Sequence, residues 1–249
     1  MRPAPIGAAL VAAAAAATSA WALATTPAGV PQAQGAASIP APTRQAAPTP
    51  LLDERFADPG LPHWDVVHAA RAGSVRVLAS GDRRLVRFTV GARDHLWDDT
   101  NGAALALVER PAEGSVRAYT VVFRTGRVPL TRRWQALAKW SSSRRDAVPA
   151  VALMLDGGRI VLQLGTGPDG RPHVVPGPRV ADGAWHTVLL RVTWASGPAG
   201  RAALSVDGRA PVTFAGATHA PGPPPDTLQV GYTRDARIGG TAHVDIAQV

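Results

Sequence analysis

Residues 182–214 alternate between apolar and polar side chains, and this pattern restricts the stretch to sheet structure. From His186 onward, apolar residues occupy every second position: Val188, Leu190, Val192 and Trp194. A period of two places these side chains on one face of a β-strand, whereas a helix would show a period near 3.6. The sequence therefore predicts a strand with one buried face.

Turn residues divide the same stretch into three strands. Ser196-Gly197-Pro198, with Gly200 just after it, contains the residue types that allow a chain reversal. Asp207-Gly208 is a strong hairpin signal, and the residues before it, from Ala202 to Val206, alternate again. We expect strand, turn, strand, Asp-Gly turn and strand in succession.

Short strands separated by turns continue through residues 51–249. About a dozen segments are predicted to be strands, and residues 151–155 and 160–164 flank an Asp-Gly-Gly turn at 156–158. Residues 91–102 are polar and are predicted to form a long loop. No segment has a convincing helical period, so we predict an all-β sandwich of two antiparallel sheets.

The first 50 residues differ from the rest of the chain. Residues 1–24 contain Arg2, an Ala-rich apolar run and the cleavage pattern Ala22-Leu23-Ala24, which together are typical of a secretory signal peptide. A single membrane anchor is the alternative, disfavoured by the short run and by two early prolines. Residues 25–50 are rich in Ala, Pro, Thr, Gln and Gly, which predicts a disordered linker. We expect a secreted or periplasmic protein that leaves the membrane once the signal is cleaved.

The chain is basic, with 26 Lys and Arg against 18 Asp and Glu and a formal net charge of +8. This balance favours polyanionic partners such as nucleic acid, anionic lipid or acidic polysaccharide. GC-rich coding, indicated by the abundance of Ala, Arg, Gly and Pro, explains the same composition equally well. Nucleic acid is disfavoured because no recognisable motif interleaves aromatic residues with cations. The absence of cysteine excludes disulfides, thiolate catalysis and Cys-ligated metal.

Several short motifs follow one another along residues 51–249. They are Phe56 with Trp64-Asp65-Val66-Val67, Trp134-Gln135 with Lys139-Trp140, Leu153 to Arg159, Gly183-x-Trp185-His186-Thr187-Val188 with Trp194, Val206-Asp207-Gly208, Gly216-x-Thr218, Leu228 to Gly231 with Arg234, and Val244-Asp245-Ile246. The ordered set resembles the secreted polysaccharide lyases of the heparin lyase I and glucuronan lyase type. The resemblance implies a concanavalin A-like β-jelly roll that cleaves acidic polysaccharide by β-elimination. A non-catalytic carbohydrate-binding or cell-envelope module on the same scaffold is the alternative.

The positions that carry catalysis in those lyases hold other residues here. The resemblance places a Gln-x-His pair at Lys139 and Ser141, and a Lys and a Tyr four residues apart at Gln229 and Thr233. Tyr232 stands one residue before the expected tyrosine and, by the period of two, should face the other way.

β-Elimination at a uronic acid needs a group that neutralises the carboxylate and a base that removes the neighbouring proton. We expect Lys139 to neutralise the carboxylate, and Tyr232 or a histidine from a loop to act as the base. Lys139, Tyr232 and Arg234 are therefore the candidate catalytic residues, and the candidate substrate-binding residues are Gln135, Ser141, Gln229 and Thr233.

Two further expectations concern the faces and the histidines. A period of two predicts one shared face for Gln135, Leu137, Lys139 and Ser141. Any of the three histidines near predicted loops can reach a groove: His63, His68 and His95. His186, at a strand start, is expected to be structural.

The chemistry requires no cofactor, but the fold suggests a structural metal site. The first and last strands meet in many concanavalin A-like folds, so Asp58 and Asp245 are candidates to hold one Ca²⁺ through carboxylate and carbonyl oxygens. We expect acidic polysaccharide as the partner and a monomer as the oligomeric state.

Overall fold

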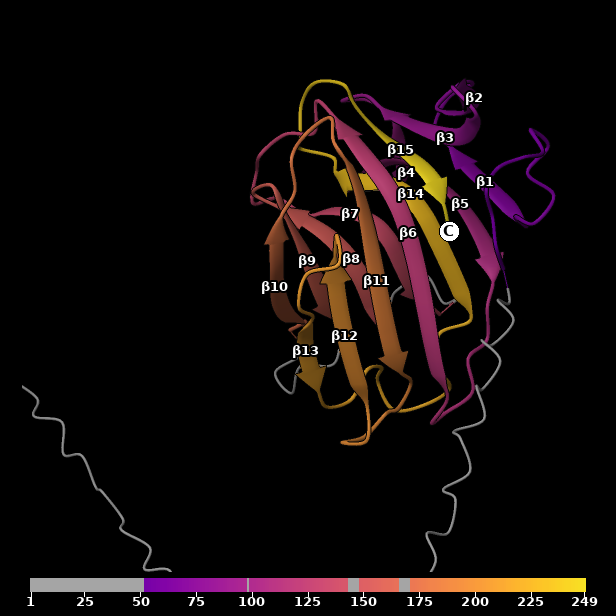
Figure 1. Ribbon diagram of the computed structural model, residues 1–249. Helices are drawn as coiled ribbons and strands as arrows, with labels where there is room; N and C mark the ends of the chain where they lie inside the picture. Colours follow the sequence, from indigo (N-terminus) through magenta and orange to yellow (C-terminus); the bar gives the residue numbers. More distant parts are fainter. Residues whose placement is uncertain (1–51, 98, 143–147, 166–170) are drawn as a thin grey trace, which may run out of the picture. The chain divides into compact units, whose positions relative to one another are not determined.

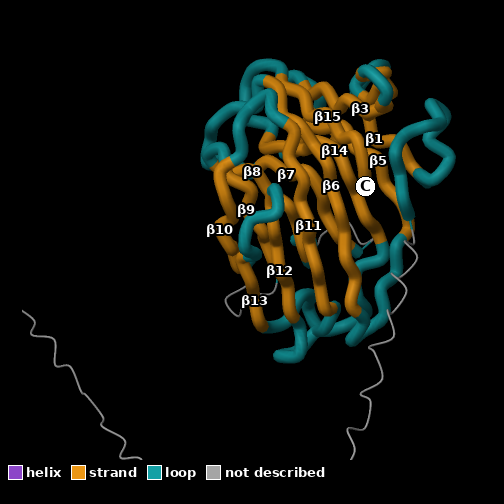
Figure 2. The backbone as a smooth tube through the Cα atoms, in the orientation of Figure 1, coloured by secondary structure: helices purple, strands orange, loops and turns teal. Residues whose placement is uncertain are grey.

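Strands and loops account for all the described residues of the computed structural model, which are 52–97, 99–142, 148–165 and 171–249 (Figure 2). The predicted signal peptide (1–24), the predicted linker (25–50) and the expected domain start at Leu51 lie outside these residues. No helix in the described ranges is long and apolar enough to cross a membrane. The predicted all-β fold is confirmed.

The described strands form two antiparallel sheets. The eight-stranded sheet has the order β1-β5-β14-β7-β8-β9-β10, with β4 also paired to β5, and the seven-stranded sheet has the order β13-β12-β11-β6-β15-β3-β2. Strands distant in sequence are neighbours, as in a jelly roll, because β14 lies between β5 and β7, and β15 lies between β6 and β3. The bounds are β1 Val66–Ala69, β2 Val75–Ser80, β3 Arg83–Val90, β4 His95–Trp97, β5 Thr100–Val108, β6 Val116–Gly126, β7 Gln135–Ser141, β8 Val151–Asp156, β9 Arg159–Leu164, β10 His173–Arg179, β11 Trp185–Thr193, β12 Arg201–Val206, β13 Val212–Ala215, β14 Thr227–Asp235 and β15 Ala242–Gln248.

The sheets lie face to face as two layers, with β11 and β6 in front of β7 and β8 in Figure 1. One hydrophobic cluster joins their inner faces, with Leu105 and Trp140 from the eight-stranded sheet and Phe123 and Leu190 from the seven-stranded sheet. Strand β11 alternates strictly between exposed and buried residues over most of its length, as the sequence predicts. Each sheet therefore has an inner face in the core and an outer face directed away from it.

Most predicted strands are present, and the differences have local causes. The three strands expected in 182–214 are β11, β12 and β13, and the hairpin around 156–158 is β8 and β9. The predicted loop at 91–102 is wrong, because it contains β4 and the first residues of β5. Strand β10 was not predicted from its sequence, which contains Pro176 and Pro178. Proline is tolerated there because β10 is an edge strand.

Adjacent leucines of β11 test the assignment of inner and outer faces. Leu190 is fully buried and Leu189 is 48% exposed. We expect Leu190→Ala to lower the free energy of unfolding by about 2–5 kcal/mol, because it leaves a cavity in the core. The matched Leu189→Ala should change it by less than about 1 kcal/mol. Chemical denaturation measures both values, and equal losses would contradict the two-layer arrangement.

Candidate active site

Lys139 lies on the outer face of the eight-stranded sheet, near the centre of that sheet. Its neighbour Trp140 is fully buried in the core between the sheets, so the alternation of β7 turns Lys139 outward. In register, Lys139 stands opposite Gln229 of β14, and Gln229 stands opposite Ala106 of β5. The long lysine side chain is half-buried on this face.

The prediction that Gln135 and Leu137 share the face of Lys139 is wrong. The pairing of β7 with β8 shifts register between Ala136 and Ala138, and both Leu137 and Ala138 belong to the main core. Such a bulge resets the alternation, so residues before and after it change sides. Gln135 consequently faces inward, where its Nε2 donates a hydrogen bond to the Pro129 carbonyl at 3.0 Å. Gln135 is thus not placed to bind substrate beside Lys139.

Three of the four candidate substrate-binding residues do lie on the outer face. Gln229 and Thr233 line a shallow hollow next to Lys139, and Ser141 pairs in register with Thr227 at the end of β7. The rest of the hollow consists of small or aliphatic residues, namely Ala104, Ala136, Leu137, Ala138 and Gly231. The Thr233 hydroxyl is buried and has no hydrogen-bond partner among the described residues. A ligand over the hollow would meet a flat, close-lying backbone and the Gln229 side chain, while the Thr233 hydroxyl stays enclosed.

Gly231, which lines this hollow, marks a close approach of β14 to β5. A Cβ at this position would lie 2.4 Å from the carbonyl oxygen of Ala103 and 2.7 Å from Cα of Ala104. Any side chain would therefore push β14 away from β5. Glycine permits the close approach of the two strands.

Two aromatic residues complete the cluster around Lys139. The Lys139 Nζ lies 5.3 Å from the centroid of the Trp97 ring, and the His68 ring meets the same indole edge-on at 5.5 Å between centroids. Trp97 comes from β4, His68 from β1 and Lys139 from β7. We call these three residues the Lys139 cluster. From sequence alone, His68 is one of three equivalent candidate histidines. Trp97 carries no signal, because it stands in a segment predicted to be a loop.

Burial and charge set the protonation of the cluster near neutral pH. Burial lowers the pKa of Lys139 to about 8. Burial, and then the charge of Lys139, lower the pKa of His68 below its usual 6.5. At pH 7 the lysine is therefore mostly charged and the imidazole mostly neutral. A cation and a proton acceptor thus lie against one indole ring.

Tyr232 and Arg234 lie on the other side of the sheet. The Tyr232 hydroxyl donates a hydrogen bond to Gln135 Oε1 at 2.7 Å within the core, and burial raises the tyrosine pKa to about 12. Arg234 is fully buried, and its Nη2 donates to the carbonyls of Val90 at 3.2 Å and Gly240 at 2.7 Å. Their inward placement contradicts the prediction that they act on substrate beside Lys139, and it follows from the alternation of β14.

The remaining candidate histidines are placed elsewhere. His63 Nδ1 pairs with Glu54 Oε2 at 2.9 Å, and His95 is exposed on β4. His186 is buried, with Nδ1 at 2.8 Å from Asp207 Oδ2 and Nε2 at 3.1 Å from the backbone of Ala181. These contacts support a structural role for His186.

The two residues proposed to bind Ca²⁺, Asp245 and Asp58, are poorly suited to do so. Asp245 is fully buried on the seven-stranded sheet, where Arg87 Nε and Arg124 Nη2 each donate to its carboxylate at 2.7 Å. Burial raises the pKa of Asp245, but the hydrogen bonds from both arginines outweigh it and hold the pKa below its usual value. Asp58 is exposed and accepts a hydrogen bond from the backbone of Gly60 at 2.7 Å. Two guanidinium groups would repel Ca²⁺, so the geometry gives no support to a site at Asp245.

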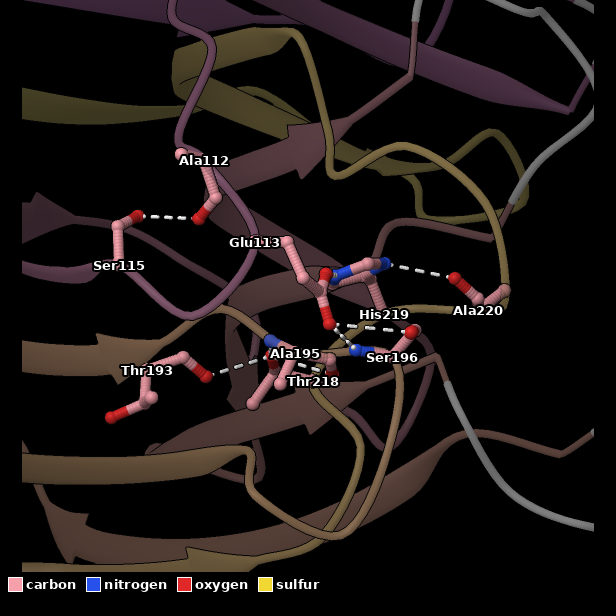
Figure 3. Close-up of polar contacts among 9 residues, drawn as sticks. All are labelled: Ala112, Glu113, Ser115, Thr193, Ala195, Ser196, Thr218, His219 and Ala220. Atoms are coloured by element: carbon pink, nitrogen blue, oxygen red, sulfur yellow. Dashed lines mark hydrogen bonds and ion pairs between the residues drawn. The ribbon is translucent and has the colours of Figure 1, made fainter.

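A second polar cluster contains Ser, His and Glu but lacks the geometry of a hydrolase (Figure 3). Glu113 Oε2 lies 2.8 Å from His219 Nε2, and Glu113 Oε1 accepts hydrogen bonds from the Ser196 amide at 2.9 Å and hydroxyl at 3.3 Å. The serine hydroxyl thus points to the carboxylate and not to the imidazole, so no base activates it. The three residues join the loops after β5, β11 and β13, and their role is to hold these loops together.

The buried charge of Lys139 should cost stability, and the cost should depend on pH. The unfolded chain, with a lysine pKa near 10.5, binds more protons than the folded chain between pH 8 and 10.5, so wild-type stability rises over this window. We expect Lys139→Met to be more stable than wild type at pH 7 by on the order of 1–3 kcal/mol. Urea denaturation should show this difference narrowing by pH 10. A difference in stability that is independent of pH would contradict the lowered pKa of Lys139.

Solved structures with the same fold include several enzymes that act on carbohydrate. Endo-β-1,4-glucuronan lyase from the fungus Trichoderma reesei has a TM-score of 0.63 and 18% identity, over 76% of this chain and 90% of that one. Alginate lyase A1-II', a member of polysaccharide lyase family 7, has a TM-score of 0.55 and 14% identity, over 71% and 82%. A carbohydrate esterase from the Shiga toxin-encoding bacteriophage phi24B has a TM-score of 0.53 and 16% identity, over 80% and 96%. At these identities the likeness shows the jelly-roll fold alone.

Comparison of the sequence with known families identifies the family, although no curated protein matches the sequence. The model of the polysaccharide lyase family, in contrast, matches residues 61–232, which include every member of the Lys139 cluster. Because this match covers more than half of the chain, the protein belongs to the polysaccharide lyase family.

Proposed function

We propose that the protein is a secreted lyase that cleaves a uronic-acid-containing polysaccharide by β-elimination at the Lys139 cluster. The observation that carries this proposal is the contact of Lys139 and His68 with one indole ring, on a sheet face of a polysaccharide lyase family member. Secretion rests on the signal-like residues 1–24.

The proposed reaction uses side chains of the cluster in two roles. The Lys139 ammonium pairs with the uronate carboxylate, which stabilises the negative charge that develops when the neighbouring C5 proton leaves. Neutral His68 accepts that proton. The C5 electron pair then forms the C4–C5 double bond as the C4–O bond breaks, and the leaving oxygen takes a proton from the His68 imidazolium or from water.

Trp97 and the hollow provide a surface for the sugar. The Trp97 side chain is 39% exposed, so part of its apolar face is free to pack against the C–H groups of a pyranose ring. Gln229 supplies an amide beside Lys139. This amide suits a hydroxyl of the neighbouring sugar unit. The glucuronan and alginate lyases that share the fold suggest polyuronates as the substrate class.

The unsaturated uronate product absorbs at roughly 235 nm, so ultraviolet absorbance follows its formation directly. We expect wild-type protein to produce this absorbance on polyglucuronate or alginate. Removing the base or the carboxylate partner, by His68→Ala or Lys139→Ala, should lower the rate by about 10²–10⁴-fold.

The matched control is His173→Ala, which removes an exposed histidine on β10, at the opposite edge of the same sheet. It should retain wild-type activity. Equal rates for His68→Ala and wild type would rule out His68 as the base.

The pH profile distinguishes the two roles. Activity should rise with pH as His68 loses its proton, at a pH below 6.5, and should fall as Lys139 loses its own, near pH 8. We therefore expect a bell-shaped plot of kcat/KM with its alkaline limb near pH 8. In Lys139→Arg, whose cation does not titrate in this range, residual activity should lose that limb. An activity that instead increases through pH 8 would make Lys139 the base.

The alternative is a non-catalytic carbohydrate-binding module on the same scaffold. It is favoured because the four positions at which the related lyases carry catalytic Gln, His, Lys and Tyr hold other residues here. These are, in the same order, Lys139, Ser141, Gln229 and Thr233. Binding of polyglucuronate or alginate without any rise in absorbance would support this alternative and contradict the lyase.

A further inference from the structure

Arginine is concentrated on the sheet opposite the Lys139 cluster. The strands of the seven-stranded sheet contain one acidic residue, Asp245, and eight arginines: Arg76, Arg83, Arg84, Arg87, Arg117, Arg124, Arg191 and Arg201. The strands of the eight-stranded sheet contain Lys139, Arg159, Arg179 and the buried Arg234 as their Lys and Arg residues. By the alternation of their strands, six of these arginines lie on the outer face, whereas Arg84 shares the parity of Val86 and Phe88 and Arg117 that of Val121 and Phe123. The positive charge of the strands is thus still greatest on the face that the proposed reaction does not use.

One row of side chains crosses five neighbouring strands of this sheet. In register, Trp185 stands opposite Arg124, Arg124 opposite Asp245, Asp245 opposite Arg87, and Arg87 opposite Arg76. The flanking residues of Asp245, Val244 and Ile246, are buried in the core. The row therefore lies on the outer face, and Figure 1 shows the strands that carry it side by side.

The buried Asp245 carboxylate holds two of these arginines in place. Arg87 donates to it from Nε and Nη2 at 2.7 and 2.9 Å, and Arg124 donates from Nη2 at 2.7 Å. The Arg124 guanidinium also stacks on the Trp185 ring, 4.8 Å from its centroid. These contacts fix the indole of Trp185 although its side chain is 40% exposed.

A hollow of about 230 Å³ opens beside this indole. Its floor includes Leu85, which is 2% exposed, and its lining is completed by Ser80, Arg83, Arg84, Trp185 and Ala247. Arg83 and Arg84 are both exposed, but alternation along β3 directs Arg83 to the outer face with Leu85 and Arg84 to the other side. The hollow therefore combines a fixed aromatic wall, an apolar floor and one cation, Arg83, with Arg84 at its margin.

We propose that this Trp185 hollow is a second binding site for anionic polysaccharide, separate from the Lys139 cluster. The indole would pack against one sugar ring, Arg83 would pair with the carboxylate of that unit, and Arg84 would add positive charge at the margin of the site. The site goes beyond the proposed function, because it performs no chemistry and does not depend on whether the Lys139 cluster cleaves its ligand.

The Trp185 hollow is placed so that it could hold one part of a polymer while the Lys139 cluster holds another. The Lys139 cluster and the Trp185 hollow lie on the outer faces of two stacked sheets, so the core separates them and one sugar unit cannot reach both. A long polymer can occupy both in turn, and binding at one raises its effective concentration at the other. One aromatic wall, without a series of stacking residues along a channel, fits a polyuronate better than a single-stranded nucleic acid.

The test measures binding by the full chain carrying Lys139→Ala, which prevents cleavage during the measurement. The probe is polyglucuronate at about 0.15 M salt, with neutral hydroxyethylcellulose for comparison. We expect the double variant Arg83→Glu with Arg84→Glu, and separately Trp185→Ala, to weaken binding of polyglucuronate at least about tenfold by calorimetry.

The matched control reverses the charge of two exposed arginines of the same sheet, by Arg191→Glu with Arg201→Glu. Arg191 lies six residues from Trp185 along β11, which is about 20 Å. This control changes the net charge equally and should weaken binding less than about threefold. Thermal unfolding checks that all variants are folded.

Three outcomes would overturn the proposal. Equal weakening by the two double variants would mean that general charge, and not the hollow, attracts the polymer. Wild-type affinity in Trp185→Ala would remove the indole from the site. Tighter binding of a DNA duplex than of polyglucuronate would assign the surface to nucleic acid. If no absorbance develops in the lyase assay, this proposal still stands. That assay measures cleavage at the Lys139 cluster, whereas the calorimetry measures binding at the Trp185 hollow.

Discussion

The structure depends on the burial of one face of each sheet, and β7 shows most clearly what this burial decides. Trp140 is fully enclosed in the core, and its insertion directs the adjacent Lys139 outward. One bulge near Leu137 and Ala138 then changes which residues accompany the lysine. The chemistry available on the outer face is thus a consequence of how the inner face packs.

The surroundings of Lys139 make this residue unusual for a surface lysine. Most surface lysines extend into water, but Lys139 lies over alanines and a glycine and against the Trp97 ring. The apolar floor that lowers its pKa also makes it a better partner for a carboxylate, since the attraction between opposite charges is stronger where water is excluded. A cost to stability and a gain in recognition therefore have the same origin.

The sequence predicts the fold well because alternation is a local property. The strands of 182–214 and the hairpin at 156–158 follow from neighbouring residues alone. The site is harder to predict, since β4, β1 and β7 bring Trp97, His68 and Lys139 together through pairings distant in the chain. The bulge that turns Gln135 inward is also invisible in a strict period of two. Likewise, composition reveals the excess of arginine but not the sheet on which it is concentrated.

Strand β10 has a consequence for the molecule in solution. It forms one margin of the eight-stranded sheet, and Pro176 and Pro178 contribute no amide hydrogens to it. A neighbouring polypeptide that tried to extend the sheet there would find an interrupted ladder of donors. Edge-to-edge pairing of two molecules through this strand is therefore disfavoured.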